Sequence, residues 1–110
     1  MEGVQLTFFV HEDDRLHGKL ASEWILDRAR TMGIHGGTAF RGVAGFGRDR
    51  VLHEDHFFDL GGPLPLWVTF ILSDEEASAL LEEVGSQDVS FFFVKSPVEF
   101  GMAGGKTEES

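Results

Sequence analysis

One stretch of the chain concentrates residues that could bind an anion. Residues 33–50 read GIHGGTAFRGVAGFGRDR, with arginines at 41, 48 and 50. Glycine lets backbone N–H groups approach a ligand closely, and the planar guanidinium of arginine can make two parallel contacts to phosphate or carboxylate. The stretch therefore has the chemistry of an anion-binding loop. The same glycines would also serve the turns of a β-hairpin, and neither G-x-G-x-x-G nor G-x-x-x-x-G-K-[ST] is present.

Histidines and carboxylates form a second group with chemical potential. The segments HEDDRLH (residues 11–17) and HEDH (residues 53–56) place imidazoles beside acids. Zinc and other divalent ions accept both kinds of ligand. His53, Glu54 and His56 are therefore an alternative metal site. Acidic loops are also commonly only solvated, and this spacing lacks the rigid helix of an H-E-x-x-H motif.

The chain lacks a recognisable catalytic constellation. It contains no cysteine and no G-x-S-x-G nucleophile motif. Asp49 and Glu54 stand near arginines, where they could exchange protons, but no neighbouring residue fixes a role for either. The sequence therefore predicts a binding protein that is not an enzyme and needs no obligatory cofactor.

The composition fits one small globular domain and excludes several classes of partner. The chain has 110 residues, 42% hydrophobic residues and a formal net charge of −10. This length suits a single core. The acidic balance argues against a nucleic-acid surface, which needs basic residues to displace counterions. The first residues form no signal peptide and the apolar runs are too short for a bilayer span, so we expect a cytoplasmic protein.

Strand and helix patterns flank the glycine–arginine segment. Residues 4–10 alternate with period two, which predicts a strand. Apolar residues recur with helical spacing over residues 16–32, and Gly33 follows as a helix stop. Residues 37–43 are short and β-like and predict a second strand. Residues 44–62 show no clear periodicity and predict a long loop, which in a compact domain usually carries function or is disordered.

The second half of the chain repeats the pattern. Residues 63–73, PLPLWVTFILS, alternate with period two and predict a strand with its prolines at the start. Ser73 then begins S-D-E-E, a capping box that predicts a helix ending at Gly85. Residues 89–94, VSFFFV, predict a fourth strand.

The order β-α-β-β-α-β predicts an α+β, ferredoxin-like fold, with a four-stranded antiparallel sheet and two helices on one face. If Leu6 and Phe8 point toward the helices, then Phe9, Trp67 and Ile71 point away from them. Soluble monomers rarely leave so large an apolar face in water. The pattern therefore predicts an oligomer of closed symmetry, and scattered surface aromatics are the alternative.

The motifs resemble those of the PII signalling proteins and, more closely, a PII-like family formerly of unknown function. The PII pattern of a glycine-threonine strand followed by Gly-Phe-Gly-Arg is matched by Gly37-Thr38 and by Gly45-Phe46-Gly47-Arg48. The PII-like pattern adds HGK, GGTxxRGxxGFG and a proline-led third strand, matched by His17-Gly18-Lys19, by the opening segment and by Pro65 through Asp74. The resemblance covers nearly the whole chain.

The resemblance implies a ferredoxin-like homotrimer whose sheets face inward and whose intersubunit clefts hold adenine nucleotides in relatives. The residues of this chain that would line the nucleotide site are Gly37, Thr38, Arg41, Gly45, Phe46, Gly47, Arg48 and Arg50. Residues 48–62 would form a mobile effector loop that acts on a protein partner. A transporter or an enzyme is the expected class of partner.

The chain also departs from PII. PII carries a second glycine-rich phosphate loop with a lysine after helix two, and two arginines near its C-terminus. Here that helix is followed by GSQDVS, and only Lys95 and Lys106 follow the start of the fourth strand. The weak neutralisation favours AMP or ADP over magnesium-ATP as the effector. The chain has no tyrosine, which excludes regulation by tyrosine modification.

We therefore expect one PII-like domain, residues 1–98, followed by a flexible tail, residues 99–110. The expected function is that of a signalling trimer that binds AMP, ADP or a related small anion between subunits. A trimeric metal-binding or metal-tolerance protein using His53, Glu54 and His56 is the alternative. A structural trimer without a ligand is a third interpretation.

Overall fold

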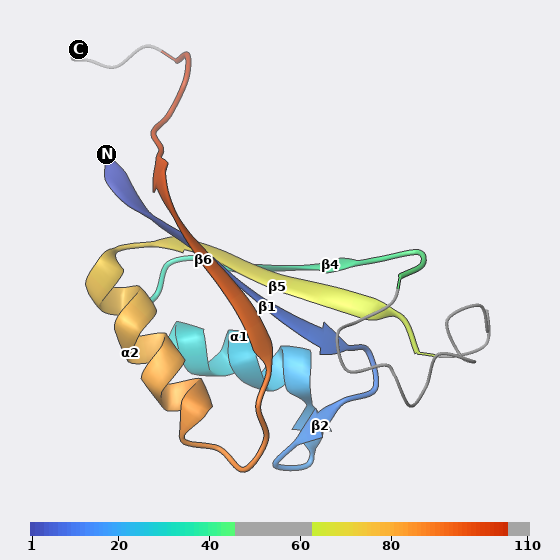
Figure 1. Ribbon diagram of the computed structural model, residues 1–110. Coiled ribbons are helices and arrows are strands. Elements are labelled where there is room, and N and C mark those ends of the chain that lie inside the picture. Colours follow the sequence, from blue (N-terminus) through green and yellow to red (C-terminus); the bar gives the residue numbers. More distant parts are fainter. Residues whose placement is uncertain (46–62, 106–110) are drawn as a thin grey trace.

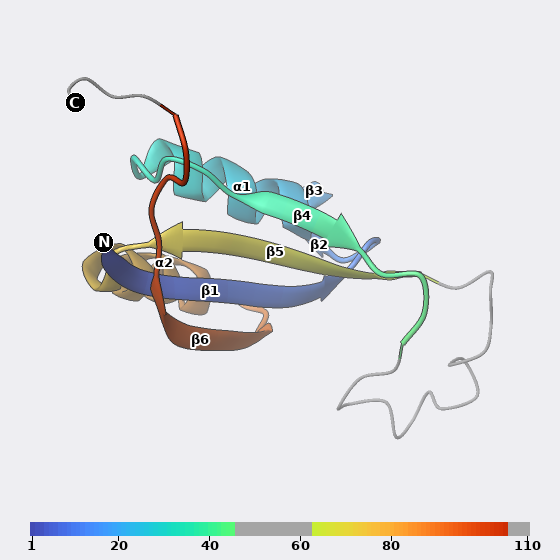
Figure 2. The ribbon, with the colours of Figure 1, turned by 90° about the horizontal axis from the view of Figure 1, so that it is seen from above.

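The computed structural model describes residues 1–45 and 63–105. Within these ranges one sheet holds β1 (Glu2–His11), β4 (Thr38–Arg41), β5 (Pro65–Leu72) and β6 (Phe92–Glu99), and the helices are α1 (Ala21–Thr31) and α2 (Asp74–Gly85). The strands are antiparallel in the order β4-β5-β1-β6. Both helices lie on one face of the sheet (Figure 1), and Figure 2 shows the strands side by side. The predicted ferredoxin-like α+β fold is confirmed.

The core forms between the helices and the two central strands because residues on β1 and β5 alternate between two environments. Leu6, Phe8, Val68 and Phe70 are buried toward the helices, whereas Trp67 is exposed on the opposite face. Register places Leu6 opposite Phe70 and Phe8 opposite Val68, so these side chains share a face. The rings of Phe8 and Phe70 meet edge-on, with centroids 6.5 Å apart.

The first helix is shorter than the predicted range of residues 16–32. It begins at Ala21, and the residues before it form a small hairpin of β2 (Arg15–Leu16) and β3 (Lys19–Leu20). The turn residues His17 and Gly18 have φ values of 54° and 80°. Positive φ at both central residues is what a tight two-residue hairpin requires. Leu16 is buried by this hairpin, so its apolar character belongs to the hairpin and not to a helical repeat.

The predicted ends of both helices are confirmed. Gly33 has a φ of 89°, and this left-handed conformation closes α1 because glycine adopts it without steric cost. At the start of α2, the Ser73 hydroxyl accepts from the Glu76 backbone N–H at 3.0 Å, and the Glu76 carboxylate accepts from the Ser73 N–H at 3.0 Å. This reciprocal pair is the predicted capping box.

The second predicted strand, residues 37–43, is shorter in the structure. Arg41 of β4 lies opposite Leu66, and the Gly42 N–H donates to the Pro65 carbonyl at 2.7 Å. Pro65 is the first residue of β5, so β4 loses its partner strand at this point. Strand β4 is an edge strand, and all four of its residues are exposed.

The fourth strand begins later and runs further than the predicted residues 89–94. It extends to Glu99 because its pairing with β1 continues to the Glu2–Glu99 pair. Pro97 is tolerated because β6 is the other edge of the sheet, where a missing N–H breaks no ladder. Beyond β6, the amino group of Met1 donates to the Phe100 carbonyl at 2.8 Å.

The sheet face opposite the helices, here called the open face, carries apolar side chains on all four strands. A row of paired aromatic residues crosses it, made of Phe40, Trp67, Phe9 and Phe92. The Phe9 ring lies 5.1 Å from Trp67 and 5.3 Å from Phe92, measured between centroids. Phe40 is 56% exposed and Trp67 52% exposed. The predicted exposure of Trp67 and Ile71 is confirmed in the single chain.

Candidate functional site

The predicted nucleotide site divides between residues inside and outside the described ranges. Gly37, Thr38, Arg41 and Gly45 are described. The other predicted site residues, Phe46, Gly47, Arg48 and Arg50, lie outside the described residues, as do residues 48–62 and the alternative metal ligands His53, Glu54 and His56. The geometry of the site therefore begins from β4 and its two ends.

Gly37 fills the junction between α1 and β4 so closely that no larger residue fits. A Cβ atom there would overlap the Phe70 ring and would lie 3.0 Å from Leu26 Cδ2. The glycine lets the chain pass directly over the core before it enters β4. Thr38 follows on the exposed edge strand, paired with Thr69 of β5. The Gly37-Thr38 pair therefore places a polar side chain at the sheet edge directly above the core.

Arg41 lies at the other end of β4, where the ends of three strands meet. Its Nε atom lies 3.5 Å from Glu12 Oε1. Glu12 directly follows β1, and its backbone N–H donates to the Leu64 carbonyl at 2.8 Å, next to the start of β5. The Arg41 side chain is 65% exposed and that of Glu12 is 31% exposed. An exposed guanidinium is thus available at this end of the sheet, already beside one carboxylate.

The described site residues do not converge on one point within a single chain. Thr38 and Arg41 lie at opposite ends of β4, three residues apart along the strand, which corresponds to about 10 Å. Gly45 lies beyond β4, where a Cβ atom would lie 3.8 Å from Pro65 Cγ. Together these residues mark a strip along the free edge of the sheet. A ligand that used both ends of the strip would have to be extended.

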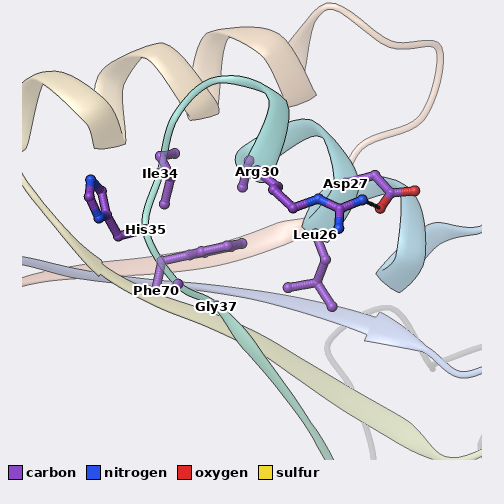
Figure 3. A pocket seen from close by; sticks show the side chains of 9 residues that line it. Leu26, Asp27, Arg30, Ile34, His35, Gly37 and Phe70 are labelled. Atoms are coloured by element: carbon purple, nitrogen blue, oxygen red, sulfur yellow. Dashed lines mark hydrogen bonds and ion pairs between the residues drawn. The ribbon is translucent and has the colours of Figure 1, made fainter.

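A shallow cavity of about 220 Å³ lies beside the start of this strip (Figure 3). Phe70, Leu26 and Ile34 supply its apolar side, and Arg30 and His35 its polar side. Arg30 is not a free cation, because its Nη2 atom donates to Asp27 Oδ1 at 3.1 Å. The cavity therefore offers little unpaired positive charge to an anion.

The same carboxylate ties α1 to the small hairpin. Lys19 Nζ donates to Asp27 Oδ2 at 2.7 Å. This hydrogen bond and the charge of Lys19 hold the pKa of Asp27 below its ordinary value of 3.8, against a small opposing effect of desolvation, and Arg30 adds to the lowering. Lys19 belongs to the HGK motif, so this lysine is paired with an acid of its own chain.

His17, from the same motif, also has a partner within the chain. Its Nε2 atom lies 2.6 Å from Gln87 Oε1, and its ring packs 5.7 Å from that of Trp24. The motif thus connects the hairpin to α1 and to the residues that follow α2. This arrangement explains the HGK pattern without a ligand.

Glu12 is the neighbour of the predicted site that sequence reasoning does not assign to it. The sequence alone indicates a solvated acidic turn or part of a metal site at HEDD. The signal that could have found Glu12 is its position directly after the first strand, since that end meets the end of β4 in this fold. Among residues 1–45 and 63–105, no cluster of three His, Cys, Asp or Glu side chains could hold a metal ion.

No helix within the described ranges combines the length and the apolar character needed to cross a membrane.

Comparison with known proteins places the chain among relatives. The profile of the DUF190 family, described as Uncharacterized ACR, matches residues 3–99. A UPF0166 protein from Aquifex aeolicus (strain VF5) is 34% identical over 79 residues, which cover 72% of this chain and 75% of that protein.

Two solved structures share the fold. The structure of CPII bound to ADP and bicarbonate, from Thiomonas intermedia K12, superimposes with a TM-score of 0.61 at 16% identity and covers 93% of this chain and 91% of that one. A PII-like signaling protein from Thermus thermophilus gives a TM-score of 0.56 at 13% identity, covering 89% of this chain and 86% of that one. At these identities the likeness concerns the fold.

Proposed function

The chain belongs to the DUF190 family, within the PII-like superfamily, and on this premise we propose that it is a signalling protein that binds AMP, ADP or a related small anion. The observation that carries the proposal is the strip along β4. A glycine-threonine pair begins the strand, an exposed arginine ends it, and the sequence then continues into Gly-Phe-Gly-Arg. Glycine-rich backbone and guanidinium groups together suit a phosphate.

The ligand class follows from the charges near the strip. Arg41 is exposed but lies beside Glu12, and Lys95 is already 3.4 Å from Asp74 Oδ1. A ligand with few phosphates needs less neutralisation than a triphosphate. The Thiomonas protein of the same fold binds ADP and bicarbonate, which supports a nucleotide of this size as the ligand of the present chain.

We also propose that the protein acts as a homotrimer that buries the open face. Phe40 and Trp67 of the aromatic row are each more than half exposed in one chain. Burial of apolar area is favourable at about 25 cal/mol per Å², so association of the open faces would stabilise the protein. In such an assembly, the β4 strip of one subunit would face its neighbour and form a cleft with it.

The output of the sensor would be a protein contact and not a reaction. Residues 48–62, which lie outside the described residues, would carry the signal to a transporter or an enzyme. The sequence contains no cysteine and no nucleophile motif, so the proposal includes no catalytic step.

Calorimetric titration with AMP, ADP, ATP and Zn²⁺ tests the proposed function. We expect heat from AMP or ADP, and a loss of about 1.5–3 kcal/mol of binding free energy in Arg41→Ala or Arg48→Ala, since each would remove a charge-assisted hydrogen bond. Arg30→Ala is the matched control, because it removes the same charge from α1. If millimolar nucleotide gives no heat, the nucleotide function is wrong.

The zinc titration addresses the metal alternative. Zinc binding that disappears in a His53→Ala, His56→Ala double variant would support a metal-binding protein instead. Zinc affinity that is unchanged in this variant would exclude these two histidines as ligands.

A further inference from the structure

The proposed site contains a carboxylate that opposes its own ligand. Glu12 Oε1 lies 3.5 Å from Arg41 Nε. An anion that contacts this guanidinium must approach the carboxylate as well, because both groups lie at the same end of the sheet. Like charges at such distances repel, and the repulsion grows with the charge of the ligand.

Glu12 is held in place by contacts that do not depend on Arg41. Its backbone N–H donates to the Leu64 carbonyl at 2.8 Å. The turn around it is closed by Asp14, whose N–H donates to the His11 carbonyl at 3.0 Å and whose Oδ2 accepts from the His11 N–H at 2.8 Å. A ligand that captured Arg41 would therefore leave the Glu12 backbone where it is.

The two side chains differ in their freedom. Glu12 is 31% exposed, about half the exposure of Arg41 at 65%. Arg41 stands on an edge strand and can turn toward a ligand, whereas Glu12 is fixed at its base by the turn. The carboxylate thus remains near any anion that binds Arg41.

We propose that Glu12 is a specificity-determining residue that limits the negative charge of the ligand accepted at Arg41. This inference rests on the proposed function. Each additional phosphate on the ligand adds repulsion from Glu12, whereas the guanidinium that the ligand contacts keeps a single positive charge. The site therefore discriminates against nucleoside triphosphates and in favour of ligands with fewer charges.

The expected size of the effect follows from the exposure of the pair. Exposed charge pairs interact by about 0.2–1 kcal/mol, which corresponds to a change of about 1.4-fold to fivefold in affinity. Neutralising Glu12 should strengthen binding by a factor in this range, and the factor should rise from AMP to ADP to ATP. Added salt should reduce it, because both groups are partly in solvent.

Glu12→Gln provides the test, since glutamine keeps the size of the side chain and the backbone hydrogen bond to Leu64. The affinities for AMP, ADP and magnesium-free ATP are measured by calorimetry at low ionic strength. Glu2→Gln is the matched control, because it changes the net charge equally at the opposite end of β1. Thermal unfolding of both variants verifies that they are folded.

The inference expects an ATP-to-AMP affinity ratio about twofold to fivefold higher in Glu12→Gln than in the wild-type protein, with no change of ratio in Glu2→Gln. In the Arg41→Ala background the same substitution should change the ratio less. An equal gain for all three nucleotides, or a gain matched by Glu2→Gln, overturns the role of Glu12 while leaving nucleotide binding intact. If none of the three proteins binds any nucleotide, the proposed function fails, and this inference fails with it.

Discussion

At the scale of single residues, the positions beside β4 combine tight packing with exposed charge. Gly37 and Arg41 lie near the two ends of one short strand, yet they are held by different forces. Gly37 is fixed by the core residues Phe70 and Leu26 that it touches, whereas Arg41 is paired with the carboxylate of Glu12 in partial contact with solvent. The two positions should therefore respond to substitution in different ways, one in stability and the other in binding.

Gly37→Ala should destabilise the protein. The new methyl group would overlap the Phe70 ring, and overpacking of a buried site costs about 1–3 kcal/mol. Denaturant unfolding measures the loss. Gly36→Ala is the neighbouring control, because a Cβ atom there meets nothing within 4 Å. Equal stability of the two variants would contradict the close packing described for Gly37.

The Lys19–Asp27 pair should make stability depend on pH in the acid range. Lys19 is the main cause of the lowered pKa of Asp27, so the pair stabilises the folded chain above the ordinary carboxyl pKa. That contribution is lost as pH falls through the lowered pKa of the folded state. NMR titration should show the Asp27 pKa rising in Lys19→Gln, and rising less in Arg30→Gln. The reverse order would show that Arg30, and not Lys19, controls this carboxylate.

At the scale of elements, the ends of helices can be predicted better than their beginnings. The capping box at Ser73 and the stop at Gly33 are local patterns, and each has a physical cause within a few residues of sequence. The predicted start of α1 is wrong because the hairpin of β2 and β3 contributes an apolar residue, Leu16, that fits the helical repeat. The pair His17-Gly18 is the signal for this turn.

Ser73→Ala should destabilise the protein by about 0.5–2 kcal/mol, the usual cost of an N-cap. The variant loses the hydroxyl that accepts from the Glu76 N–H. Ser78→Ala, at an exposed position inside α2, should be neutral or slightly stabilising because alanine is a better helix former. Thermal or denaturant unfolding compares the two. A loss in Ser78→Ala as large as that in Ser73→Ala would argue against the cap.

Strand lengths could not be predicted because they are set by the partner and not by the strand itself. β4 ends where β5 begins at Pro65, and β6 continues to Glu99 because β1 continues beside it. For the same reason the sequence could name Arg41 as an anion ligand but could not place Glu12 beside it. That contact depends on three strand ends meeting, which a pattern within one segment does not contain.

At the scale of the whole molecule, alternation along the strands was sufficient to predict the open face. It assigned Trp67 and Ile71 to the side away from the helices, and both are exposed there. The sequence also indicated which segment would carry the strip along β4. How much of a binding site that strip forms in an assembly depends on a second chain, which no single-chain pattern can position.

Trp67→Glu should shift the protein from trimer to monomer, since it would place a charge at the centre of the aromatic row. Burying an unpaired charge in an apolar interface is strongly unfavourable. Light scattering measures the mass. Met102→Glu serves as the control, because Met102 is 96% exposed and lies outside the sheet. A wild-type protein that is already monomeric would contradict the proposed assembly.

The open face is not uniformly apolar, and this gives it a directional code. Next to the aromatic row runs a row of hydroxyls, in which Thr38, Thr69 and Thr7 lie side by side and the last two hydroxyl oxygens are 2.9 Å apart. The two rows are two residues apart along each strand, about 7 Å. A covering surface displaced by that distance would press its apolar groups onto hydroxyls. The stripes therefore determine the register of a partner as well as its affinity, and a surface of matching greasiness but wrong spacing would be rejected.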